Sequence, residues 1–274
     1  MLDFLKAVVL GVIQGLTEFL PISSSAHLRI FPELFGWGDP GAAFTAVIQI
    51  GTELAVLIYF RKDIWRIGST WCRSLVNPEL RGSLDSRMGW FIIVGSLPIV
   101  ILGIVFKDTI ERDFRNLWII GTTLIVLGVV LGIADRVSRG DRVIKEMTLR
   151  HSVFLGLAQA CALVPGVSRS GATISMGRFL GYDREAATRF AFLLAIPAVV
   201  GAGIFELNEI PHGGNAYGWG PTIVATIVSF LVGYAAIAWL LRYVSTKSYL
   251  PFVIYRVALG AFTLSMVGTG VLTP

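Results

Sequence analysis

A short polar stretch interrupts the first apolar segment of the chain and holds the side chains best suited to chemistry. These are an amide, a carboxylate, three hydroxyls and an imidazole: Gln14, Glu18, Ser23, Ser24, Ser25 and His27. Gln14 and Glu18 are four residues apart and therefore share one helix face, whereas the rest follow a break at Pro21. Polar groups inside an apolar segment are costly unless a ligand uses them or other groups pair with them.

Two interpretations of this stretch are open. In the structural one, Ser24 or Ser25 caps the helix that follows the break, and Glu18 pairs with His27. In the functional one, the group binds or transforms a ligand. We favour function, because capping accounts for only one or two of the hydroxyls.

A second polar stretch follows Pro165-Gly166 and centres on Arg169, which stands between Ser168 and Ser170, with Thr173 one turn later. An arginine flanked by hydroxyls at the start of a helix is typical of phosphate sites. The helix end offers unpaired N–H groups, and the guanidinium adds a two-pronged donor. The tripeptide alone is a weak signal, but it becomes stronger if the Glu18–His27 stretch lies opposite it.

The composition predicts that these stretches lie within a membrane. The 274 residues are 54% hydrophobic and only 15% charged, with a mean hydropathy of +0.72, whereas soluble domains carry about 25% charged residues. Four segments of about 18 residues or more contain no Asp, Glu, Lys or Arg: 88–106, 117–134, 216–241 and 257–274. We therefore predict an all-α polytopic membrane protein in which the net charge of +5 reflects topology, not a nucleic-acid partner.

The expected helices fall into two similar series. They cover roughly 5–20, 24–33, 41–60, 88–106 and 116–135, and then 149–164, 171–180, 185–205, 220–241 and 249–270. In each series the first two are short and separated by a proline break, which predicts a re-entrant hairpin followed by three spans. Each repeat crosses an odd number of times, so the second copy must be inverted. We expect one membrane domain over 1–274: repeat one at 1–135, a linker at 136–148 and repeat two at 149–274.

Loop charges orient this arrangement. Segment 61–87 holds six Lys or Arg against three acids and 136–150 holds five against two, while 107–115 is balanced and 205–219 has no Lys or Arg. The first two are therefore expected in the cytoplasm and both termini outside. The hairpins then enter from opposite faces, and their serine-rich tips meet in the middle.

Three further charges inside expected spans have no settled role. Glu53, with Gln49 a turn before it, Arg189 and Arg256 are each interpreted equally well as pocket residues, interhelical ion pairs or snorkelling side chains. His151 and His212 are assigned no function.

The polar stretches resemble two signatures of the bacterial undecaprenyl-diphosphate phosphatases of the bacitracin-resistance family. Gln14-Gly-Leu-Thr-Glu18 resembles (Glu/Gln)-x-x-x-Glu, and Pro165-Gly-Val-Ser-Arg169-Ser-Gly-Ala-Thr173 resembles Pro-Gly-x-Ser-Arg-Ser-x-x-Thr. The resemblance extends over essentially the whole chain. With Gln14 at the first signature position, Glu18 is the only acid of that pair.

The resemblance implies hydrolysis of undecaprenyl diphosphate to undecaprenyl phosphate and inorganic phosphate in the bacterial inner membrane. This reaction recycles the carrier for peptidoglycan and other envelope polymers, and it removes the diphosphate that bacitracin captures. The resemblance also implies a divalent cation, an outward-facing site and a homodimer.

On this basis we expect Glu18, with Gln14, to bind Mg²⁺ or Ca²⁺, and Arg169 to hold the terminal phosphate. The hydroxyls and backbone groups expected to complete the phosphate site belong to Ser23, Ser25, Gly166, Ser168, Ser170 and Thr173. Direct attack by His27, attack by Ser24 and attack by a metal-bound water remain alternatives for the nucleophile. The competing function is a secondary transporter or flippase of polyprenyl phosphate, because inverted repeats with broken helices also suit transport.

Overall fold

The computed structural model describes residues 2–106, 116–209 and 215–273. Within these residues the protein is helical and contains no named strand; a single isolated bridge joins Arg142 and Tyr182. The first series comprises α1 (Leu2–Phe19), α2 (Ser24–Leu34), α3 (Ala42–Tyr59), α4 (Arg61–Val76), η1 (Pro78–Leu80), α5 (Leu84–Val105) and α7 (Leu117–Val137). After η2 (Ile144–Glu146), the second comprises α8 (Leu149–Ala160), η3 (Cys161–Leu163), α9 (Arg169–Phe179), α10 (Arg184–Glu209), α11 (Trp219–Val244) and α12 (Leu250–Gly268).

Four helices, α5, α7, α11 and α12, are long and apolar enough to cross a bilayer, and the bent pair α3–α4 gives a fifth candidate. Their outer faces expose large aliphatic side chains, among them Ile104 on α5, Ile133 on α7 and Ile227 on α11. Such a surface suits lipid better than water. The protein is therefore a polytopic membrane protein, although the described residues contain four or five candidate spans and not the six expected from the sequence.

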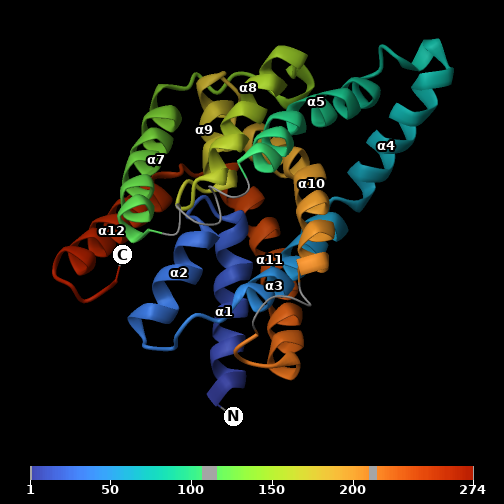
Figure 1. Ribbon diagram of the computed structural model, residues 1–274. Coiled ribbons are helices and arrows are strands. Elements are labelled where there is room, and N and C mark those ends of the chain that lie inside the picture. Colours follow the sequence, from blue (N-terminus) through green and yellow to red (C-terminus); the bar gives the residue numbers. More distant parts are fainter. Residues whose placement is uncertain (1, 107–115, 210–214, 274) are drawn as a thin grey trace.

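The expectation that 61–87 is a loop is wrong, because this segment contains the helix α4. This helix bends by 69° away from α3 and extends from the bundle at one edge (Figure 1). Its positive charges hid it from a search for apolar segments. Asp63 anchors it, accepting from Arg189 of α10 at 2.6 Å and from Arg66 at 3.1 Å.

The helix pairs α1–α11 and α5–α8 approach so closely that only glycine fits at the point of contact. A Cβ atom on Gly11 of α1 would collide with the backbone of Ala225 in α11, and one on Gly156 of α8 would collide with the backbone of Gly95 in α5. Helix α1 therefore packs on α11 in the same way that α8 packs on α5. Contact without side chains between the backbones is typical of helix packing in membranes.

The two hairpins, α1–α2 and α8–α9, approach the middle of the molecule from opposite ends (Figure 1). In each, the chain breaks after a short helix and restarts at a serine: Ser23 before α2 and Ser168 before α9. These are the only non-glycine residues with positive φ in the described part of the chain, at 76° and 66°. The breaks predicted from Pro21 and Pro165-Gly166 are confirmed.

Candidate active site

The two hairpin breaks lie against each other and exchange hydrogen bonds. The Ser170 hydroxyl donates to the carbonyl of Leu20 at 3.2 Å, and the N–H of Gly166 donates to Ser25 Oγ at 3.3 Å. Two of the predicted substrate-binding hydroxyls, those of Ser25 and Ser170, therefore join one hairpin to the other. The expected meeting of the tips is confirmed.

Arg256 of α12 donates hydrogen bonds to backbone carbonyls at both helix breaks. It is fully buried, and its guanidinium donates to the carbonyls of Pro21 at 3.1 Å and of Gly166 and Val167 at 3.0 Å each. Carbonyls at a helix break lack intrahelical donors, and lipid supplies none. Arg256 is thus neither a residue of the pocket described below, nor part of an ion pair within the described residues, nor a snorkelling side chain. Its guanidinium binds backbone carbonyls.

The predicted residues Ser23, Ser168 and Thr173 have local roles. Ser23 Oγ accepts from the N–H of Ala26 at 3.4 Å, and Ser168 Oγ accepts from the N–H of Gly171 at 3.2 Å. Each is thus the N-cap of its helix, and the cap of α2 is Ser23, not Ser24 or Ser25 as the structural interpretation expected. The Thr173 hydroxyl donates to the carbonyl of Arg169 one turn earlier, at 2.9 Å. Backbone strain of the kind seen at Ser23 and Ser168 often accompanies functional sites.

Glu18 is the centre of the polar group. Its Oε1 accepts from Arg169 Nη2 at 2.7 Å, and its Oε2 accepts from the Ser24 hydroxyl at 2.6 Å and from the Gln14 amide at 3.2 Å. The same amide donates to Thr52 Oγ1 of α3 at 3.3 Å. The structure therefore brings together Gln14, Glu18, Ser24 and Arg169, from two hairpins separated by about half of the chain.

A pocket opens beside this group. Its polar lining is formed by Glu18, Thr52, Glu53, Arg169 and Ser170. Its apolar lining is formed by Phe19, Val56, Ala191, Phe192, Ala195 and Val199. Charged groups on one side and aliphatic and aromatic groups on α3 and α10 suit a ligand with an anionic head and an apolar tail.

His27 does not line this pocket. Its Nδ1 lies 2.6 Å from the carbonyl of Ser23, so this nitrogen bears the proton, and its Nε2 lies 2.7 Å from the hydroxyl of Tyr255. The ring is buried and stacks on Tyr255. The structural pairing considered for Glu18 and His27 is therefore wrong, because Glu18 pairs with Arg169 instead.

The donor set of the pocket fits a hard cation. Among the residues that the structure describes, no group of three or more His, Cys, Asp and Glu side chains is placed to hold a metal ion. Glu18 and Glu53, however, both line the pocket, and Mg²⁺ in phosphate sites is often bound by one or two carboxylates together with water and the phosphate itself. The amide of Gln14 donates to both Glu18 Oε2 and Thr52 Oγ1, so these two side chains stand beside Gln14.

Two residues of the site were missed from the sequence, namely Thr52 and Tyr255. Both stand next to residues that were considered, Glu53 and Arg256, in apolar helices. Glu53, left open, is a pocket residue, whereas Arg189 forms an ion pair with Asp63 at 2.6 Å. Segment 107–115 lies outside the described residues, as does 210–214, which includes His212.

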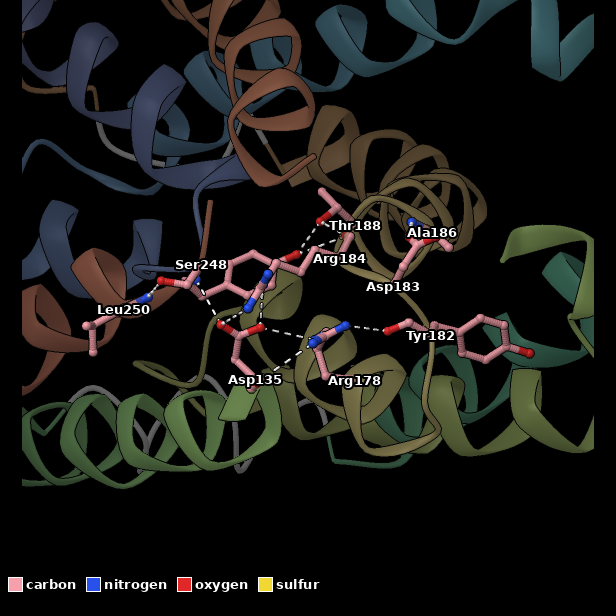
Figure 2. Close-up of polar contacts among 10 residues, drawn as sticks. Asp135, Arg178, Tyr182, Asp183, Arg184, Ala186, Thr188, Ser248 and Leu250 are labelled. Carbon is pink, nitrogen blue, oxygen red and sulfur yellow. Dashed lines mark hydrogen bonds and ion pairs between the residues drawn. The ribbon is translucent and has the colours of Figure 1, made fainter. Parts of the chain in front are cut away.

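A second charged cluster lies at the opposite end of α9 from Arg169. Asp135 of α7 accepts from Arg178 at 3.1 Å, from Arg184 at 2.7 Å and from the N–H of Tyr249 at 3.1 Å. Figure 2 shows that Arg178 and Arg184 converge on the single carboxylate. The hydrogen bond with Asp135 raises the pKa of Arg184. The cluster ties the C-terminal end of α9 to α7, α10 and the start of α12, and so fixes the helix whose first residue is Arg169.

Comparison with known proteins identifies the family of this chain. Residues 7–262 match the family described as bacitracin resistance protein BacA. A protein of a Nocardioides species named undecaprenyl-diphosphatase is 77% identical, with 99% of each chain aligned. Proteins of the same name from Thermobifida fusca and Clavibacter michiganensis are 56% and 55% identical, over 100% and 98% of this chain and 93% and 98% of theirs. The chain belongs to the bacitracin resistance protein BacA family.

Proposed function

We propose that this chain is an undecaprenyl-diphosphate phosphatase, which releases inorganic phosphate and leaves undecaprenyl phosphate. One observation carries the proposal: Glu18, Ser24 and Arg169, from two separate hairpins, meet beside a pocket with one apolar wall. The relatives named undecaprenyl-diphosphatase, aligned over nearly their whole length, support the same reaction. The product returns to cell-wall synthesis, and consumption of the diphosphate protects the cell from bacitracin.

In this proposal Arg169 binds the terminal phosphate. In the structure its Nη2 is paired with Glu18 at 2.7 Å, and the side chain lines the pocket, so its other N–H groups would serve an incoming anion. Arg169 is also the first residue of α9, so free N–H groups of the helix end lie near the same place. Ser23, Ser25, Gly166, Ser168, Ser170 and Thr173 complete the phosphate site through their backbone and by fixing the shape of the two breaks.

Ser24 is our choice for the nucleophile and Glu18 for its base, because the Ser24 hydroxyl already donates to Glu18 at 2.6 Å. Ser24 Oγ would attack the terminal phosphorus while Glu18 takes the hydroxyl proton. The bond from that phosphorus to the bridging oxygen breaks, and the electron pair leaves with undecaprenyl phosphate. Water then cleaves the seryl phosphate, which releases inorganic phosphate and restores the serine.

His27 receives an indirect role in this scheme. Its Nδ1–H binds the carbonyl of Ser23, the residue before Ser24, and Tyr255 holds its other nitrogen. His27 thus supports the backbone on which Ser24 stands. Direct attack by His27 would first require loss of the hydrogen bond to Tyr255.

We further propose a Mg²⁺ or Ca²⁺ requirement, with Glu18 and Gln14 as the protein ligands. When bound, the cation neutralises charge on the phosphate oxygens. Gln14 contributes through its amide oxygen, which requires its amide to turn from the orientation in which it donates to Glu18 and Thr52.

The architecture proposed for this function is an inverted repeat, 1–135 and 149–274 around the linker 136–148, in one membrane domain. The matched pairs α1 on α11 and α8 on α5, and the two serine-capped breaks, support it. The excess of Lys and Arg in 61–87 and 136–150 places both termini outside and the site toward the external face. A homodimer in the bacterial inner membrane is part of the same proposal.

Phosphate release and lipid transfer separate this function from a flippase. Purified protein in detergent is given undecaprenyl diphosphate with and without Mg²⁺, and inorganic phosphate is measured. Metal-dependent release from the wild type, lost in Glu18→Gln, is the expected result. Translocation of polyprenyl phosphate in vesicles without phosphate release in detergent would instead establish transport.

A further inference from the structure

Glu53 stands out among the pocket residues because it is buried and has no cationic partner of its own within the described residues. The residue is 7% exposed, and its Oε1 accepts a hydrogen bond from Gln49 at 3.3 Å. No cation within the described residues forms an ion pair with it. The nearby cation is Arg169, which is already paired with Glu18.

The second oxygen of Glu53 faces α10, where Gly203 leaves room for it. A Cβ atom at Gly203 would collide with Glu53 Oε2. This oxygen accepts no hydrogen bond from the described residues. A buried carboxylate in such surroundings is costly unless a proton or a cation compensates it.

The sum of the charges around the pocket favours binding of a cation there. Glu18 and Arg169 neutralise each other, so Glu53 in its ionised form leaves one negative charge in the pocket where a diphosphate would bind. That ligand adds about two to three negative charges, which would repel the carboxylate. A divalent ion between them turns the repulsion into attraction.

We propose that Glu53 is a second carboxylate ligand of the divalent cation at this site, opposite Glu18 and Gln14. This inference rests on the proposed phosphatase function and adds a residue that lies outside both signature stretches. Glu53 and Glu18 then contribute one oxygen each from two different helices, α3 and α1, and the phosphate and water complete the coordination.

Binding of Mn²⁺ to the purified protein without substrate tests this directly. Titrations followed by the electron paramagnetic resonance of free Mn²⁺ should show an affinity at least about 10-fold weaker in Glu53→Gln than in the wild type. Glu79→Gln, at an exposed position in η1 that does not line the pocket, is the matched control and should bind Mn²⁺ as tightly as the wild type does. Equal Mn²⁺ affinity in Glu53→Gln and wild type, or no binding by the wild type at millimolar Mn²⁺, overturns the proposal.

Gly203→Ala provides a second variant, which keeps both the Glu53 and the Glu18 carboxylate. Its methyl group should displace the Glu53 carboxylate and weaken Mn²⁺ binding several-fold with an unchanged melting temperature. Unchanged Mn²⁺ affinity in this variant would speak against the proposal even if Glu53→Gln failed to fold.

The Mg²⁺ dependence of phosphate release separates this inference from the proposed function. Glu53→Gln should need at least about 10-fold more Mg²⁺ than the wild type for half-maximal phosphate release. A wild type that binds Mn²⁺ through Glu53 but releases no phosphate would refute the phosphatase proposal alone. A wild type that releases phosphate with a Mg²⁺ dependence unaffected by Glu53→Gln would refute the ligand role alone.

Discussion

Helix α9 has an arginine–carboxylate pair at each end, and the two pairs differ in how completely they are satisfied. At its C-terminal end, Asp135 accepts from Arg178, Arg184 and the N–H of Tyr249 (Figure 2). At its N-terminal end, Glu18 binds Arg169 as its one ionic partner within the described residues, and both line a pocket. The residues of the first cluster do not line this pocket, whereas Glu18 and Arg169 of the second do.

This difference shows that burial of a charge pair is not by itself a sign of function. An ion pair saturated with hydrogen bonds gives specificity to the fold, and a ligand cannot enter it without breaking several contacts. A pair at the edge of a pocket can exchange one partner for a ligand. The cluster at Asp135 is accordingly interpreted as structural and the pair at Glu18 as functional.

Removal of Arg169 is the strongest test of the distinction between the structural cluster and the functional pair. We expect Arg169→Ala to lower phosphate release by about 10³-fold or more, since an arginine that stabilises a transferring phosphoryl group contributes that much. Its melting temperature in detergent should stay near that of the wild type. Arg139→Ala, at an exposed position of the linker, is the control, and a comparable loss in that variant would remove the special role of Arg169.

The second prediction separates the neighbours Ser24 and His27. Ser24→Ala should lower turnover by about 10²- to 10³-fold, because it removes the hydroxyl that donates to Glu18. His27→Gln should lower it by about 10-fold or less, because His27 acts through the carbonyl of Ser23. Rapid quenching with ³²P-labelled substrate should trap phosphate on Ser24, and label on His27 would reverse the assignment.

The third prediction concerns the saturated cluster. Asp135→Ala leaves Arg178 buried without its carboxylate, which should cost about 3 kcal/mol of stability. Thermal unfolding in detergent should show this loss, while the folded fraction retains turnover within a few-fold of the wild type. A variant of normal stability with abolished turnover would place Asp135 in the catalytic machinery instead.

Much of the fold follows from the sequence because lipid imposes strict rules. Charge-free runs predicted α5, α7, α11 and α12, and a proline after a short apolar helix predicted each break. Helix α4 was not predicted, because Arg61, Lys62 and Arg66 mark a loop under rules that search for apolar length. An amphipathic pattern among those charges was the signal that would have found it.

The candidate site was predicted only as far as its residue types reveal it. Glu18, Ser24 and Arg169 stood out as polar groups in apolar segments, and they do meet. The place of His27 depended on Tyr255, which lies 228 positions away, and local spacing contains no trace of that contact. Arg256 could not be assigned either, because its partners are backbone carbonyls, which have the same chemistry at every residue.

The smallest expected effect is a pH dependence near the saturated cluster. Burial, with the charges of Arg142 and Arg150, lowers the pKa of His151 from 6.5, and its Nδ1 lies 2.8 Å from the hydroxyl of Tyr182. The unfolded chain therefore takes up a proton at a higher pH than the folded protein does. The stability that comes from neutral His151 is full above pH 6.5 and is lost as the pH falls through the lowered pKa.

Melting temperatures between pH 7.5 and 5.5 should decrease slightly more in the wild type than in His151→Gln. Because His151 is far from Glu18 in the chain and absent from the pocket lining, the pH profile of phosphate release at a temperature well below melting should be the same in both proteins. A profile that shifts with His151→Gln would mean that the two ends of α9 are coupled, and the division into a structural and a functional pair would no longer hold.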